Sequence, residues 1–222
     1  MCCTLALKER GRRLPWYDVG DMSTAAILLA AGESTRMGRP KALLPWGETT
    51  LIAYQVGELL AASVEDVVVV LGHAAEEVRP QVPAAAQIAV NEAYRQGRAS
   101  SLRAGAAALP DDADPIVVLN VDQPRPNELL RTLLAAHRQG GSLITMPAAQ
   151  GRRGHPPVLT GSLLPELRAA SEGSQGLRGV IASHQDAVRE VPFDSALVLL
   201  DINTASEYQR ALAELGRPSP PG

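Results

Sequence analysis

Short apolar runs alternate with longer amphipathic segments along the first two thirds of the chain. Residues 24–30 (TAAILLA) and 64–72 (VEDVVVVLG) are almost continuously apolar, which is typical of buried strands. Between such runs, segments such as 50–63 place apolar residues three and four positions apart, as one face of a helix requires. The pattern predicts strands at 24–30, 64–72, 86–91, 114–122 and 141–147, and helices at 50–63, 74–82, 100–109 and 126–139.

Strands that alternate with helices indicate right-handed βαβ units and a mainly parallel sheet. We therefore expect an α/β fold of three layers, Rossmann-like, with a mostly parallel sheet and helices on both faces. After Pro147 the pattern changes, because residues 148–161 are rich in glycine and proline. The remainder predicts a small late β-rich insertion and a closing helix, with helices at 162–171, 176–184 and 204–215 and strands at 187–193 and 197–202.

The first 22 residues do not share this alternation. They have no sustained period and no apolar core of a secretory signal, and they end at a second methionine, Met22. We predict that residues 1–22 are a dispensable N-terminal extension and that 23–216 form one domain, long enough to bury a core. Residues 217–222 are expected to be a tail.

Composition excludes several classes of protein. The net charge of -3 and the seven aromatic residues argue against a nucleic-acid-binding protein, which usually carries a basic face or stacking platforms. No apolar run approaches the ~20 residues of a membrane span. The two cysteines, Cys2 and Cys3, are adjacent and cannot staple a fold or complete a zinc site. These features predict a cytoplasmic enzyme that binds neither nucleic acid nor membrane.

The connection after the first strand is unusually long and cationic. Residues 29–47 (LAAGESTRMGRPKALLPWG) contain Gly32, Gly38, Arg36 and Lys41, whereas a plain strand-to-helix connection needs only a few residues. Glycines let backbone amides approach an anion closely, and the cations neutralise a polyphosphate. Such a loop lies where open α/β sheets bind ligands. It matches neither the G-x-G-x-x-G dinucleotide fingerprint nor a P-loop, but it predicts a phosphate site.

Lysine is rare in this chain, which has 19 arginines and only two lysines, Lys8 and Lys41. An ammonium differs from a guanidinium in reach and hydration. Its position in the loop favours a phosphate-contacting role for Lys41, with chance as the alternative.

The loop resembles the nucleotide-binding signature of the MobA-like nucleotidyltransferases, and within them most closely that of the molybdenum cofactor cytidylyltransferases. Their Leu-Ala-Ala-Gly-x-Ser-x-Arg-Met-Gly-x-Pro-Lys pattern falls on residues 29–41, followed by Leu-Leu-Pro-Trp at 43–46. Further similar segments are VNEAYRQGRASSLRAG, VVLNVDQPRP, GRRGHPPVL and DINTASEY, so that the resemblance spans 24–215. Two positions depart from the family pattern, where Ser174 and Asn203 each replace an aspartate.

The resemblance implies an Mg²⁺-dependent nucleotidyltransferase, in which a substrate phosphate attacks the α-phosphorus of a nucleoside triphosphate and expels pyrophosphate. It implies CTP as the nucleotide, because Ala31 stands where guanylyl-transferring relatives carry glycine. It also implies a molybdopterin-type phosphate substrate, with an apo-molybdoenzyme or its chaperone as a further partner. The alternatives are a guanylyltransferase, a sugar- or alcohol-phosphate nucleotidyltransferase, or a non-catalytic maturation factor that binds nucleotide.

The resemblance and the positions of strand ends together give a set of candidate site residues. Asp122 and Asp201 each end an expected strand, so their carboxylates are placed to hold Mg²⁺ at one sheet edge. Arg36 and Lys41 would clamp the triphosphate and act with Asp122 in catalysis. The nucleotide-binding residues would be Leu29, Ala30, Ala31, Gly32, Arg36, Gly38, Lys41, Asn91, Ser100 and Ser101, and the substrate-binding residues Arg152, Arg153 and His155.

Several of these residues have a structural alternative. Asp122 is also suited to cap the helix that begins near Pro126, and Ser100 or Ser101 to cap the helix that they open. The stretch DINTASE can form a capping box between Thr204 and Glu207, which leaves Asp201 without a necessary role in catalysis. Arg36, Arg152, Arg153 and His155 can equally belong to exposed loops.

Overall fold

A computed structural model describes residues 23–34 and 37–216 of the chain, and the predicted extension, the tail and Arg36 lie outside them. The described residues form one domain around an eight-stranded sheet. The strands run in the order β10-β7-β9-β6-β1-β4-β5, and β8 pairs with β7. These strands are β1 (Ala25–Leu29), β4 (Asp66–Leu71), β5 (Gln87–Val90), β6 (Ile116–Asn120), β7 (Ile144–Ala149), β8 (Arg152–Arg153), β9 (Val158–Leu159) and β10 (Val188–Pro192).

The sheet is mostly parallel, as the alternating pattern predicts. β1 pairs in parallel with both β4 and β6, β4 with β5, and β10 with β7. β1 is therefore an inner strand of the sheet, with hydrogen-bonded neighbours on both sides. Its carboxyl end lies beside the carboxyl end of β6, and this edge carries the candidate site.

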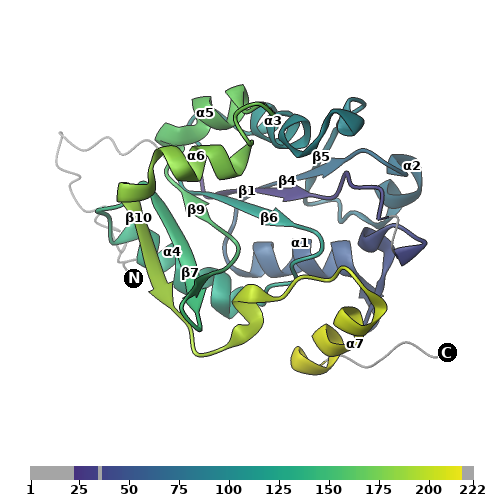
Figure 1. The fold of residues 1–222 in the computed structure, drawn as a ribbon. Coiled ribbons are helices and arrows are strands. Elements are labelled where there is room, and N and C mark those ends of the chain that lie inside the picture. Colours follow the sequence, from purple (N-terminus) through teal and green to yellow (C-terminus); the bar gives the residue numbers. More distant parts are fainter. Residues whose placement is uncertain (1–22, 35–36, 217–222) are drawn as a thin grey trace, which may run out of the picture.

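Helices cover both faces of the sheet and make three layers (Figure 1). Successive side chains of β1 point to opposite faces: Ala26 and Leu28 enter one apolar layer, and Ala25 and Ile27 the other. The first layer packs against α1 (Leu51–Ala61), α4 (Asn127–Arg138) and α7 (Ala205–Glu214). The second packs against α3 (Arg98–Ala108), α5 (Leu164–Ala169) and α6 (Leu177–Ser183). The expected three-layer α/β fold is confirmed.

The later part of the chain adds its strands to the same sheet. β9 is inserted antiparallel between β6 and β7, and β8 forms a short antiparallel pair with the end of β7. Smaller elements complete the domain: β2 (Pro45–Trp46) and β3 (Thr49–Thr50) form a separate two-stranded ribbon, and α2 (Ala75–Val78) follows β4.

The strand predicted at 197–202 is wrong. Residues Ala196–Leu199 form a 3-10 helix, whose first turn is capped by the Ser195 side chain. The physical reason is that the buried guanidinium of Arg125 takes the carbonyls of Val198 and Leu200, which a strand would give to a neighbouring strand. Asp201 therefore follows a loop and not a strand. Within the described residues, no helix is long and apolar enough to cross a membrane.

Candidate active site

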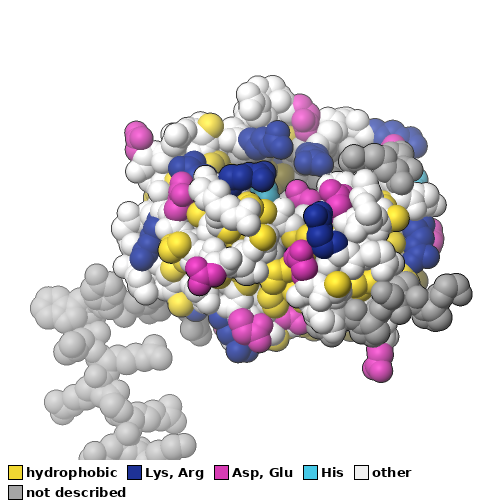
Figure 2. All heavy atoms as spheres, turned by 60° about the horizontal axis from the view of Figure 1, so that its bottom comes forward, with side chains coloured by type: hydrophobic (Ala, Val, Ile, Leu, Met, Phe, Trp, Pro, Cys, Tyr) yellow, Lys and Arg dark blue, Asp and Glu magenta, His cyan; other side chains and the backbone are white. Residues whose placement is uncertain are grey.

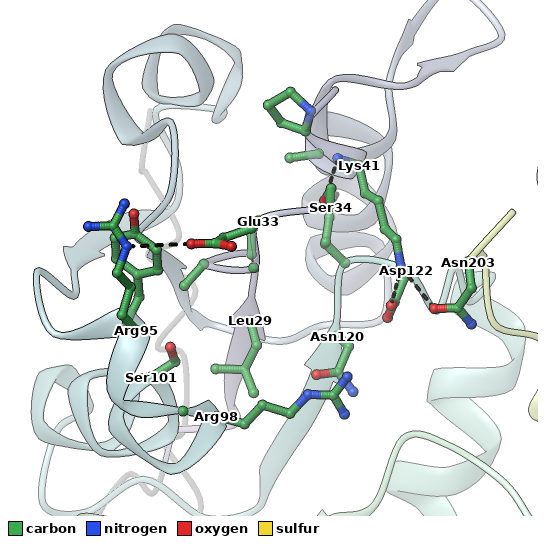
Figure 3. Close-up of a pocket in the computed structure, with 18 residues that line it drawn as sticks. Leu29, Glu33, Ser34, Lys41, Arg95, Arg98, Ser101, Asn120, Asp122 and Asn203 are labelled. Atoms are coloured by element: carbon green, nitrogen blue, oxygen red, sulfur yellow. Dashed lines mark hydrogen bonds and ion pairs between the residues drawn. The ribbon is translucent and has the colours of Figure 1, made fainter. Parts of the chain in front are cut away.

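A cavity of about 440 Å³ opens where the connections after β1 and β6 meet (Figure 3). Parallel strands bring their carboxyl ends to one edge of a sheet, so residues distant in sequence converge there. Its described lining comes from the loop after β1, the end of β6, the start of α3 and the approach to α7. These residues are Leu29, Ala30, Ala31, Gly32, Glu33, Ser34, Pro40, Lys41, Ala42, Tyr94, Arg95, Gly97, Arg98, Ser101, Asn120, Val121, Asp122 and Asn203.

Lys41 and Asp122 form the ion pair at one side of this cavity. The Lys41 Nζ donates to Asp122 Oδ2 at 2.8 Å and to Asn203 Oδ1 at 3.0 Å. The two paired side chains are only 12% and 20% exposed, so water screens their attraction less than it would on an open surface. The two residues that the sequence singles out for phosphate and metal binding are thus brought into contact.

The alternative in which Asp122 serves as a helix cap is wrong. Pro126 is the N-cap residue of α4, and no side chain caps it. The first helical amide, that of Asn127, donates instead to Glu58 Oε2 on α1 at 2.5 Å. The Asp122 carboxylate therefore faces the cavity without a role in starting the helix.

The loop after β1 takes its shape from Ser34 and Gly38. Both have a positive φ, 52° and 67° respectively, and the Ser34 hydroxyl accepts the Lys41 backbone amide at 3.1 Å. Glycine adopts this conformation without strain, but Gly38 does not line the cavity. Gly32 does line it, and a Cβ added there would meet no atom within 4 Å. The left-handed conformation in the first half of the loop belongs to Ser34.

Asp201 reaches the site through a chain of side-chain amides. Asn120 Nδ2 donates to Gln123 Oε1 at 2.9 Å, and Gln123 Nε2 donates to Asp201 Oδ1 at 2.7 Å. The Ile202 amide also donates to the Asp122 carbonyl at 2.8 Å, which places the two aspartate segments side by side. Asp201 itself is not part of the cavity lining. The predicted capping box does form, between Thr204 and Glu207, and it leaves the Asp201 carboxylate out.

Arg125 is the fully buried cation behind the site. Its guanidinium donates to the carbonyls of Pro124, His155, Val198 and Leu200 at 2.9–3.1 Å. Burial lowers its pKa to about 10, against the raising effect of the nearby Asp201 and Asp122 carboxylates. Arg125 remains charged at neutral pH. It therefore fixes the segment that carries Asp201 and Asn203 and adds positive potential behind the two aspartates.

Asn91 and the two serines of α3 form a buried polar cluster. The Asn91 amide donates to Ser100 Oγ at 2.8 Å and to Ser101 Oγ at 3.0 Å. The prediction that a serine caps α3 is wrong, because the Ser100 hydroxyl donates to the Gly97 carbonyl and the Ala99 amide donates to Glu172 Oε1 at 2.5 Å. Only Ser101 of the three lines the cavity. Asn91 and Ser100 shape its wall from behind.

The three predicted substrate residues lie outside the cavity lining. Arg152 and Arg153 form the exposed strand β8, and Arg153 pairs with Glu190 at 2.7 Å on the surface. The His155 backbone amide donates a hydrogen bond to the Val198 carbonyl, and its carbonyl accepts one from the Arg125 guanidinium. Burial lowers the pKa of the His155 imidazole, while Asp201 and Asp122 are close enough to oppose that shift. His155 is thus within electrostatic range of the aspartates, and the two arginines are engaged elsewhere or exposed.

Several lining residues were not among the predicted site residues. Glu33 and Arg95 form an ion pair at 3.5 Å, and the Arg95 guanidinium lies 5.3 Å from the centre of the Tyr94 ring. Arg98 extends across the cavity toward Asn120 (Figure 3). The sequence signal for Tyr94, Arg95 and Arg98 is their place between Asn91 and Ser101, in the segment that resembles the family, whereas Glu33 lies within the loop of residues 29–47. Arg36, predicted as a second phosphate clamp, lies outside the described residues.

The oxygen donors at this edge fit a divalent cation that is shared with a substrate. Mg²⁺ usually binds through one or two carboxylates together with substrate phosphates and water. Lys41 engages Asp122 Oδ2 and Gln123 engages Asp201 Oδ1, so each carboxylate has a second oxygen to offer. Among the described residues, no group of three or more His, Cys, Asp or Glu side chains forms an all-protein metal site. Asp122 and Asp201 would therefore hold the ion jointly with phosphate oxygens.

Comparison with known proteins gives a consistent family relationship. Residues 26–188 match the model of the MobA-like NTP transferase domain. Nicotine blue oxidoreductase from Paenarthrobacter nicotinovorans is 32% identical over 195 residues, which are 84% of this chain and 95% of that protein. The bifunctional protein GlmU from Leifsonia xyli is 36% identical over 137 residues, but these are 58% of this chain and only 28% of GlmU. The chain thus spans less than a third of that relative.

Solved structures with the same fold include two mycobacterial proteins. The homolog of Mycobacterium tuberculosis Rv0371c from Mycobacterium sp. strain JC1 has a TM-score of 0.74 and 30% identity, with 87% of this chain and 96% of that chain covered. Rv0371c from Mycobacterium tuberculosis H37Rv, solved in complex with manganese, has a TM-score of 0.72 and 29% identity, with 86% and 99% covered. A divalent cation thus accompanies one protein of this fold and similar sequence.

Proposed function

The chain belongs to the MobA-like NTP transferase family, and on this basis we propose that it is a CTP:molybdenum cofactor cytidylyltransferase. Its substrates would be CTP and the phosphate of the molybdopterin-type cofactor, and its products the cytidylylated cofactor and pyrophosphate. An apo-molybdoenzyme or its chaperone would receive the product. The choice of CTP is supported by Ala31, which lines the cavity at the position where guanylyl-transferring relatives carry glycine.

The observation that carries the proposal is the Lys41–Asp122 pair. A cation suited to binding phosphate and a carboxylate suited to binding a metal meet at 2.8 Å, at the carboxyl edge of a parallel sheet. Both face a cavity whose described wall includes residues 29–34 and 40–42. Nucleotidyl transfer needs positioning and charge neutralisation more than a protein nucleophile, and this arrangement supplies both.

The reaction that follows from this geometry is an in-line displacement. An oxygen of the acceptor phosphate forms a bond to the α-phosphorus of CTP, the bond from that phosphorus to the bridging oxygen breaks, and pyrophosphate leaves with the electron pair. Asp122 and Asp201 would hold Mg²⁺, and the bound ion would supply positive charge to the phosphate oxygens. Lys41 turns its ammonium from Asp122 to the triphosphate as the nucleotide enters, and Asn203 offers a neutral acceptor that keeps Lys41 near the site.

Pyrophosphate release from each of the four common nucleoside triphosphates, measured with and without molybdenum cofactor, tests the proposal. We expect CTP with the cofactor to give the highest turnover, and Lys41→Ala to slow it ~10²-fold or more through loss of a charge-stabilising donor. Arg79→Gln, on the exposed surface beside Glu76, is the matched control and should leave turnover unchanged. Release that is fastest with another nucleotide or acceptor would replace the proposed substrates.

Because the chain is similar to nicotine blue oxidoreductase, the same purified protein is also assayed for reduction of nicotine blue. The protein is mixed with nicotine blue and reduced nicotinamide nucleotide, and loss of the blue colour is followed. Dye reduction without any pyrophosphate release would contradict the proposed transferase activity.

A further inference from the structure

The charged residues that line the cavity do not balance within it. Five described lining residues carry charge: Glu33, Lys41, Arg95, Arg98 and Asp122. Glu33 pairs with Arg95, and Lys41 pairs with Asp122. No described residue forms a hydrogen bond or ion pair with the Arg98 guanidinium. Among the described lining residues, one positive charge is therefore left for a ligand.

Several other arginines of the domain pair with acidic residues or carbonyl groups. Arg153 pairs with Glu190 and Arg168 with Asp111 on the surface, and on the face in Figure 2 basic and acidic side chains are interspersed. Arg98 differs from these residues because its side chain extends across the cavity toward Asn120 (Figure 3).

The backbone on either side of Arg98 is fixed. Gly97 has a φ of 113°, and its carbonyl accepts the Ser100 hydroxyl at 2.8 Å. The Ala99 amide donates to the Glu172 carboxylate. Because Glu172 already occupies this amide at the start of α3, an anion in the cavity would meet the Arg98 side chain and not that backbone group. The guanidinium thus projects from an anchored position.

We propose that Arg98 is a specificity-determining residue that binds a phosphate group of the substrate by a two-pronged contact. The planar guanidinium matches phosphate oxygens better than a lysine ammonium does. The proposal rests on the proposed function, since it places this phosphate in the same cavity as Lys41 and Asp122. The phosphate belongs either to the nucleotide triphosphate or to the acceptor phosphomonoester, and the experiment below separates these sources.

The test compares wild-type protein with Arg98→Gln and Arg98→Lys by calorimetry and by steady-state kinetics. Calorimetry with CTP, CMP and inorganic triphosphate measures nucleotide binding without any acceptor. Loss of one charged contact should weaken binding ~10- to 100-fold in Arg98→Gln, with Arg98→Lys intermediate. Because Arg98 is exposed, both variants should keep the thermal midpoint of the wild type. Arg79→Gln is again the surface control.

Each outcome has one meaning for Arg98. Weaker binding of CTP and inorganic triphosphate assigns Arg98 to the triphosphate. Unchanged nucleotide binding with a ~10-fold or greater rise in the acceptor KM, and little change in kcat, assigns it to the acceptor phosphate.

If wild type transfers CMP but neither the nucleotide affinity nor the acceptor KM changes in Arg98→Gln, Arg98 is not a phosphate ligand although the proposed function stands. If wild type binds inorganic triphosphate Arg98-dependently but transfers no nucleotide, the proposed function fails and the Arg98 site stands. If wild type binds none of the probes and shows no transfer, both proposals are overturned.

Discussion

At the scale of single residues, the site depends on how two aspartates and two cations share a small space. Asp122 meets Lys41 directly, whereas Asp201 is held by Gln123 and lies near the buried Arg125. Two carboxylates that converge without cations would repel each other. Lys41 and Arg125 supply that compensation within the protein, so a metal ion is not required to hold the two segments together.

This arrangement predicts different effects for the two aspartates. Asp122→Asn should abolish most turnover, because Asp122 lines the cavity and would make the main metal bond. CTP should still bind weakly through the loop from Gly32 to Lys41. Asp201→Asn should be milder, since Asp201 lies behind the lining and contacts Gln123. Turnover is measured against Mg²⁺ concentration for both variants, with nucleotide binding measured separately. Wild-type turnover and metal dependence in Asp122→Asn would show that the metal assignment is wrong.

At the scale of elements, local sequence patterns predict the strands and helices of the regular βαβ units. They do not predict an element whose conformation depends on a single buried contact from a distant part of the chain. Apolar periodicity is enough to find β1, β4 and β6, because these strands are buried on both faces and lie in sequence-regular βαβ units. Residues 197–200 are equally apolar, yet the buried Arg125 takes their carbonyls and a 3-10 helix results. That guanidinium acts over more than 70 residues of sequence, so no local pattern contains it.

The candidate site likewise contains residues that the sequence predicts and residues that it misses. Lys41 and Asp122 could be found from their motifs and from the end of an expected strand. Arg98 could not be singled out, because its place between Asn91 and Ser101 marks the segment but does not indicate that this one side chain extends into the cavity. Arg152 and Arg153 look like ligands in a glycine-rich segment, but strand pairing with β7 directs them to the exposed edge.

Gly97, which precedes α3, and Gly57, which lies within α1, should respond to alanine in opposite ways. Gly97→Ala should destabilise the protein by ~1–3 kcal/mol, because φ at Gly97 is 113° and a Cβ there would lie 2.3 Å from the Glu172 carboxyl carbon. Gly57→Ala in α1 is the matched control, since a Cβ there would meet nothing within 4 Å. It should stabilise the protein by ~0.5–1 kcal/mol. Chemical unfolding measures both, and equal effects would contradict the anchoring role given to Gly97 and Glu172.

At the scale of the whole molecule, the described domain is anchored at its N-terminal boundary by Thr24. The Thr24 amide donates to Glu65 Oε2 at 2.9 Å, and Arg138 donates to its hydroxyl at 2.6 Å. Its carbonyl accepts the amides of Glu65 and Asp66 at 2.8 and 3.1 Å. Thr24 thus joins the start of β1 to the start of β4 and to the end of α4.

These contacts predict where the chain can be shortened. A protein that starts at Met22 keeps Ser23, Thr24 and the whole of β1, and should retain its thermal midpoint and its turnover. A second protein, with a start methionine placed directly before Ala26, loses Thr24 and the fully buried Ala25. It should unfold at a temperature several degrees lower. It loses the hydrogen bonds of Thr24 with Glu65 and Asp66, and it loses the buried Ala25, which pairs with β4 and β6. Thermal unfolding and pyrophosphate release are measured for both proteins beside the full chain. If the Met22 protein precipitates or loses most of its activity, residues 1–21 contribute to the fold or to the reaction, and the predicted boundary is wrong.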